Sequence, residues 1–176
     1  MHREQRDRPQ EATIYRYRLL RKISLRREIG YSHAAAGLLC PAALAAIHGW
    51  MGLLGAFLAL PIMAALHMLV LRLTLRRVET VAFKRWTFRA DWPGLGPYPA
   101  TDASLRLFRR VHAHLLLVGL CIAALMYPWS SPFFITLMFW HLWLLAPRFW
   151  LLVILRRENP DVVLRFESGE LWLYLP

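Results

Sequence analysis

Four apolar runs alternate with basic segments along this chain. The runs cover residues 31–48, 51–71, 111–127 and 133–155. Each is near the length that crosses a bilayer as a helix. Short uncharged stretches separate the first run from the second and the third from the fourth, so each pair predicts an antiparallel hairpin. We therefore expect an all-α integral membrane protein with four transmembrane helices, arranged as two antiparallel hairpins.

A different pattern follows the last run. Residues 162–166 and 171–174 are short apolar stretches on either side of the polar segment Glu167–Glu170. This pattern predicts a small C-terminal β-hairpin. Because a lone two-stranded hairpin is only marginally stable in water, we expect it to rest on the membrane, on the basic connector or on a partner.

These patterns divide the chain into five segments. They are a basic cytoplasmic or interfacial N-terminal segment (1–30), the first hairpin (31–71), a basic cytoplasmic connector (72–110), the second hairpin (111–155) and a cytoplasmic tail with the β-hairpin (156–176). From Ile14 onward the first segment predicts a helix on the membrane surface. In the connector, the Pro and Gly content of residues 92–99 predicts a loop, and Thr101 or Asp102 is expected to cap the next helix.

Composition agrees with a membrane protein. The chain has 176 residues, of which 57% are hydrophobic, and this share is too apolar for a water-facing domain of that size. Cys40 and Cys121 both lie inside apolar runs, where no disulfide framework is expected. They are expected to pack as small apolar residues.

The basic residues predict the orientation. Nine of the 22 Lys and Arg residues lie in 1–30, nine in 72–110 and three in 156–176, and neither short turn between paired runs has any. By the positive-inside rule, both termini should be cytoplasmic at an inner or plasma membrane. Anionic lipid headgroups are the expected counter-charge, and no nucleic-acid motif is present. The expected lipid contacts are Arg26, Arg27, Arg76, Arg77, Arg109 and Arg110.

Three histidines are candidate ligands for a haem or a transition metal. His33, His67 and His114 are expected at similar depth near the cytoplasmic face. Imidazoles that converge between helices can ligate either group. The alternative is that each is hydrogen-bonded at the membrane interface, because no HxxxH or CxxC pattern supports a site. His141 is expected near mid-bilayer, too far from the others to share a metal.

Arg148 is the one formal charge well inside an apolar run. An intramembrane charge is a candidate functional residue. The alternative is that the guanidinium extends along the helix toward the cytoplasmic interface.

The sequence lacks the usual marks of an enzyme. No run contains Asp or Glu, and no phosphate-binding loop, paired carboxylates or HExxH occurs. The missing carboxylates also weaken a third hypothesis, a small dimeric transporter. The sequence favours an accessory, scaffold or assembly subunit that acts at the cytoplasmic leaflet, through contacts with other membrane proteins or itself. The alternative is a haem- or metal-binding protein in electron transfer or oxidase assembly.

Overall fold

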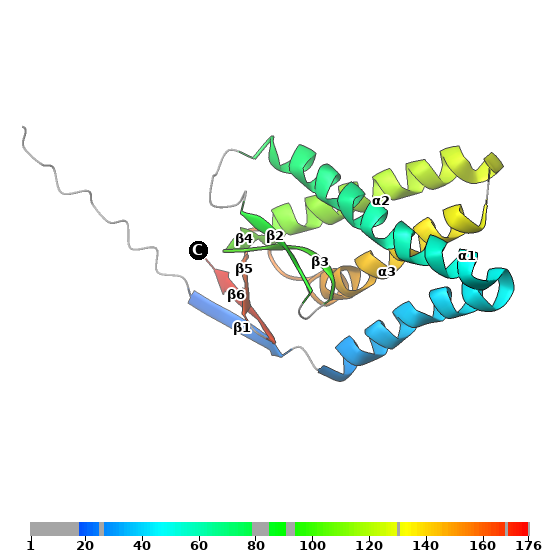
Figure 1. The fold of residues 1–176 in the computed structure, drawn as a ribbon. Helices are drawn as coiled ribbons and strands as arrows, with labels where there is room; N and C mark the ends of the chain where they lie inside the picture. The colour runs from blue at the N-terminus through cyan, green and yellow to red at the C-terminus, as the bar shows by residue number, and fades with distance from the viewer. Residues whose placement is uncertain are drawn as a thin grey trace, which may run out of the picture.

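The computed structural model describes residues 18–24, 27–78, 85–90, 94–129, 131–167 and 169–175. Within these ranges the chain forms three α-helices and two antiparallel sheets. The helices α1 (Arg27–Leu75), α2 (Leu105–Met126) and α3 (Pro132–Ile154) lie side by side, and the strands gather at one end of them (Figure 1). Each helix is long and apolar enough to cross a membrane.

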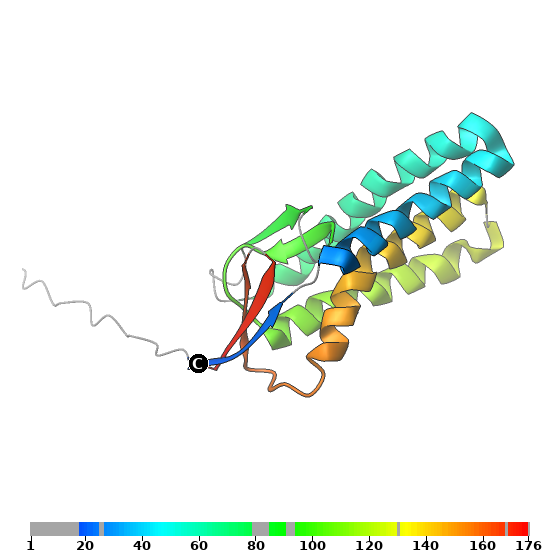
Figure 2. The same ribbon diagram turned by 90° about the horizontal axis from the view of Figure 1, so that it is seen from below.

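The prediction of four helices is wrong. Residues 31–48 and 51–71 both belong to α1, a single assigned helix of 49 residues. The backbone of α1 is non-helical at Gly49 (φ 62°, ψ −149°), and the chain turns back there (Figure 2). A Cβ on Gly52 would collide with the carbonyl oxygen of Leu44. Because glycines allow both the positive φ and this close approach, the reversal needs no polar loop between two helices.

The all-α class is also wrong, because two sheets pack at the end of the helices. In the four-stranded sheet the two outer strands flank the predicted C-terminal hairpin, which is therefore not isolated. The order is β1 (Arg18–Ser24), β6 (Glu170–Leu175), β5 (Val163–Glu167) and β4 (Ala103–Ser104). The second sheet pairs β2 (Trp86–Arg89) with β3 (Gly96–Pro99).

The N-terminal segment is a strand over the part that the structure describes. A surface helix was predicted there, but β1 pairs with β6 from Arg18↔Leu175 to Ser24↔Glu170. Only Ile23 of this strand is buried. The open edge of β6 offers backbone hydrogen bonds that a helix could not use, so pairing with a distant strand overrides the local helical spacing. Residues 1–17 lie outside the described ranges.

The predicted loop 92–99 is partly a strand. Residues 91–93 lie outside the described ranges, and β3 pairs with β2 from Arg89↔Gly96 to Trp86↔Pro99. A strand with two prolines lacks two backbone donors, and such strands occur at sheet edges, where β3 lies. The Pro and Gly content therefore marked an edge strand as well as a turn.

The sheet is fixed to the helices by one apolar cluster. Phe108 of α2, Leu151 of α3 and Leu171 of β6 are fully buried in it, and Ile23 of β1 packs there with 9% of its surface exposed. Each such side chain contributes about 1.5–3 kcal/mol when it leaves water. The strands and the helices therefore share a core at this end of the molecule.

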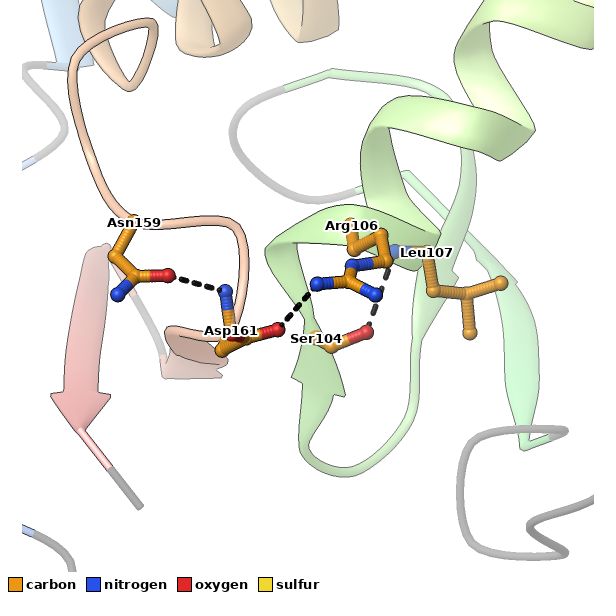
Figure 3. Close-up of polar contacts among 5 residues, drawn as sticks. All are labelled: Ser104, Arg106, Leu107, Asn159 and Asp161. Atoms are coloured by element: carbon orange, nitrogen blue, oxygen red, sulfur yellow. Dashed lines mark hydrogen bonds and ion pairs between the residues drawn. The ribbon is translucent and has the colours of Figure 1, made fainter.

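The start of α2 is held by the segment that follows α3 (Figure 3). Ser104, and not the predicted Thr101 or Asp102, is the N-cap, and its Oγ accepts from the backbone N–H of Leu107 at 3.2 Å. The N–H of Arg106 donates to the carbonyl of Pro160 at 2.9 Å, and its guanidinium pairs with Asp161 at 2.8 Å. These bonds satisfy amides that a helix leaves without partners in its first turn.

Asp102 has a different role from the predicted cap. Both of its carboxylate oxygens accept from Arg165 of β5, at 2.7 and 2.8 Å. These hydrogen bonds raise the pKa of the Arg165 guanidinium above its ordinary value. A two-point pair of this kind fixes β5 beside the segment that leads into α2.

Candidate functional site

Arg148 lies at the centre of the candidate site. It is fully buried in α3, so its guanidinium does not extend to solvent. Nη1 donates to the carbonyl of Leu144 one turn earlier, and Nη2 donates to the carbonyl of Leu95 at 2.6 Å. The guanidinium carbon also lies 4.8 Å from the ring centre of Tyr98, a cation–π distance. Arg148 therefore ties the β2–β3 hairpin to the helices.

Two glycines let the hairpin reach Arg148. Gly94 and Gly96 have φ values of 138° and 146°, which side-chain-bearing residues rarely adopt. A Cβ on Gly96 would collide with the guanidinium nitrogens of Arg148. A Cβ on Gly94 would lie 3.0 Å from Cγ of Pro147. The backbone of this segment therefore packs directly on α3, which continues through Pro147 as a helix.

A buried histidine pair lies in the helical body. Nε2 of His67 on α1 and Nδ1 of His141 on α3 are 2.9 Å apart. The rings meet edge to face with centroids 5.1 Å apart. Gly119 of α2 makes room for this pair, since a Cβ there would collide with the His141 ring. The histidine pair therefore connects α1 to α3 through a hydrogen bond, and its His141 ring packs closely against α2 at Gly119.

A third buried imidazole, that of His112, lies on α2. Nδ1 of His112 lies 2.7 Å from the carbonyl oxygen of Phe108. Among the described residues, Nδ1 of His67 and Nε2 of both His112 and His141 are buried without a hydrogen-bond partner. These imidazoles place polar atoms inside an apolar helical body.

The structure does not bring together the three predicted metal ligands. His33 stacks on Trp143 with ring centres 4.3 Å apart, His67 pairs with His141, and Nδ1 of His114 lies 3.1 Å from Oγ1 of Thr74. In the described part of the chain, no group of three His, Cys, Asp or Glu side chains is arranged to hold a metal ion. The arrangement of these imidazoles therefore gives the haem or metal hypothesis no support.

The predicted lipid-contacting arginines differ in their surroundings. Arg27, Arg76, Arg77 and Arg110 are exposed, and Arg26 lies outside the described ranges. Arg109 is partly buried and donates to the carbonyls of Leu155 and Glu158, at 2.6 and 3.4 Å. A cation at the carboxyl end of α3 is favourable because that end carries partial negative charge. Arg109 therefore stabilises the end of a helix.

Sequence reasoning missed the part that His141, His112 and Tyr98 play in the site. His141 was placed too far from the other histidines, yet it contacts His67 directly. Gly119 indicates that another residue approaches α2 closely, but sequence spacing alone does not reveal that this residue is His141.

Comparisons with models of protein families, with curated proteins and with solved structures find no match for this chain.

Proposed function

We propose that this chain is an integral membrane subunit that assists or assembles other membrane proteins, with its strand-bearing end at the cytoplasmic leaflet. The observation that carries the proposal is the separation of charge along the molecule. Basic residues are on the strands and on the helix ends beside them, whereas residues 48–50 and 127–129 contain no Lys, Arg, Asp or Glu. Figure 1 shows that these two segments lie at the end of the helices away from the strands. The positive-inside rule makes the strand-bearing end cytoplasmic.

Large apolar side chains on the outside of the helices support membrane insertion. Leu39 and Ile47 are 69% and 72% exposed, and Phe57 is 63% exposed. A water-soluble protein rarely leaves so much apolar side-chain surface uncovered. Lipid tails or other transmembrane helices would cover these side chains.

One face of α1 supports contact with a partner helix. Small residues share a face of the part of α1 that precedes Gly49. They are Ala35, Ala42 and Ala46, at intervals of seven and four residues. All three are exposed. Small side chains let two helices approach closely in a bilayer. Some bulky side chains of α3 are not available to a partner helix because they pack inside the molecule. Trp140, for example, is buried against α1, where its Nε1 donates to the carbonyl of Ala56 at 2.9 Å.

Site-specific photocrosslinking tests this proposal. A photoreactive amino acid at position 42 should give one or a few discrete protein adducts in intact membranes, with this chain itself or with another membrane protein. The matched control is the same amino acid at position 117, where Leu117 is also exposed on a helix, and it should give mainly lipid adducts. Equal crosslinking from the two positions, or protein adducts from neither, would contradict the subunit role.

A further inference from the structure

An open groove lies between the carboxyl end of α1 and the first half of α2. Its polar side chains are those of Thr74, Arg77, Arg110 and His114. The cavity volume is about 500 Å³. The end of α1 and the start of α2, between which the groove lies, are at the end of the helices where the strands gather (Figure 2).

Neither arginine of the groove is paired with another residue that the structure describes. Both are exposed, and the structure gives neither guanidinium a hydrogen bond or an ion pair with another described residue. Three neighbours differ in this respect: Arg106 pairs with Asp161, Arg109 with the end of α3, and Arg165 with Asp102. Both cations of the groove are therefore available to an anion, as are those of Arg72 and Arg76, which are also exposed near this end of α1.

The hydrogen bond between His114 and Thr74 connects the two walls of the groove. It joins Nδ1 of His114 on α2 to Oγ1 of Thr74 on α1 at 3.1 Å. Between them, the two side chains and the two guanidiniums supply several donors that suit the oxygens of one phosphate group.

The rest of the groove is apolar. Val70 and Leu73 of α1 and Val118 of α2 line it. Beyond it, Leu69 and Leu117 are 54% and 60% exposed on the same two helices. A ligand with a phosphate at one end and a hydrocarbon chain at the other would meet donors first and apolar side chains next.

We infer that this groove binds an anionic phospholipid, with the phosphate between Arg77 and Arg110 and an acyl chain along Val70, Leu73 and Val118. The inference rests on the proposed function, because it requires that this end of the helices lies at a lipid headgroup layer. It narrows the expected attraction between basic residues and anionic headgroups to one defined site. The apolar wall favours a lipid over free phosphate, which would leave that wall unused.

Native mass spectrometry of the protein released from nanodiscs tests the site. The discs contain phosphatidylglycerol and phosphatidylcholine in equal amounts, and the measured quantity is the phosphatidylglycerol that stays bound. The double variant Arg77→Gln/Arg110→Gln should bind it about tenfold to a hundredfold more weakly, because two charge-assisted hydrogen-bond donors are lost. The control Arg156→Gln/Arg157→Gln removes the same charge from exposed positions at the end of α3 and should change binding less than threefold.

Two further measurements distinguish a bound phospholipid from free phosphate. Val118→Trp fills the apolar wall without altering charge, so it should also weaken lipid retention. Millimolar inorganic phosphate should not displace the lipid, and displacement would mean that the groove takes free phosphate. If wild-type protein prefers phosphatidylglycerol but the groove and control variants lose it equally, the defined site is wrong and the proposed function stands. If wild-type protein shows no preference for phosphatidylglycerol, the expected attraction between the basic residues and anionic headgroups fails as well.

Discussion

At the scale of single residues, Arg148 shows how a buried charge is accommodated here. Its guanidinium donates to two backbone carbonyls and lies on an aromatic ring, and the carbonyl of Leu95 comes from the connector. Buried carbonyls that lose their donor cost about 1–3 kcal/mol each. Arg148 is therefore best described as a positioning residue that holds the β2–β3 hairpin on α3.

The substitution Gly96→Ala tests this contact. The added methyl group would collide with the guanidinium of Arg148, and alanine is strained at φ 146°. We expect the free energy of unfolding to fall by about 2–4 kcal/mol, seen as a lower melting temperature in detergent. Gly169→Ala is the matched control, because Gly169 also has positive φ but no atom within 4 Å of an added Cβ. If both variants lose the same stability, the clash with Arg148 plays no part.

Sequence alone identified Arg148 but not its partners. A single charge in an apolar run is visible without a structure. The carbonyl of Leu95 and the ring of Tyr98 were not predicted, because residues 92–99 were interpreted as a loop with no defined position. His67 was likewise named as a candidate ligand, while its actual partner His141 was excluded on estimated depth.

At the scale of elements, the helices were easier to predict than the strands. The apolar run 133–155 located α3 to within one position at each end, and the run 111–127 covers α2 except for its first six residues. The number of helices was wrong, since Gly49 reverses α1 without ending it. β1 was predicted as a helix from its local spacing of apolar and basic residues. Its strand conformation depends on pairing with β6, which lies at the other end of the sequence. Contacts between residues so far apart leave no trace in local spacing.

The substitution Ile23→Asp tests the pairing of β1. Ile23 is 9% exposed in the core shared by strands and helices, so a carboxylate there should cost about 2–4 kcal/mol and release β1 from β6. Trypsin should then cleave after Arg21 much faster than in the wild type. Leu19→Asp is the control, because Leu19 is 43% exposed on the same strand, and it should leave this cleavage rate nearly unchanged. Equal protection of all three proteins would argue against a paired β1.

At the scale of the whole molecule, an apolar helical body carries a smaller, basic, strand-rich end. The shared core makes these two parts one unit, and the hydrogen bonds at the start of α2 fix the segment after α3 to it. The helices that carry the proposed lipid groove also carry the candidate partner face, and the described basic residues lie mainly beside the strands. The proposed role requires that this basic end lies on the cytoplasmic side of the membrane.

Cysteine labelling tests this orientation most directly. In a background with Cys40→Ala and Cys121→Ala, single variants His48→Cys and Arg157→Cys place a thiol at exposed positions at opposite ends of the helices. A membrane-impermeant maleimide should label His48→Cys in intact spheroplasts and Arg157→Cys only after lysis. The reverse pattern, or the same labelling of both positions before lysis, would contradict a membrane-spanning protein with a cytoplasmic basic end.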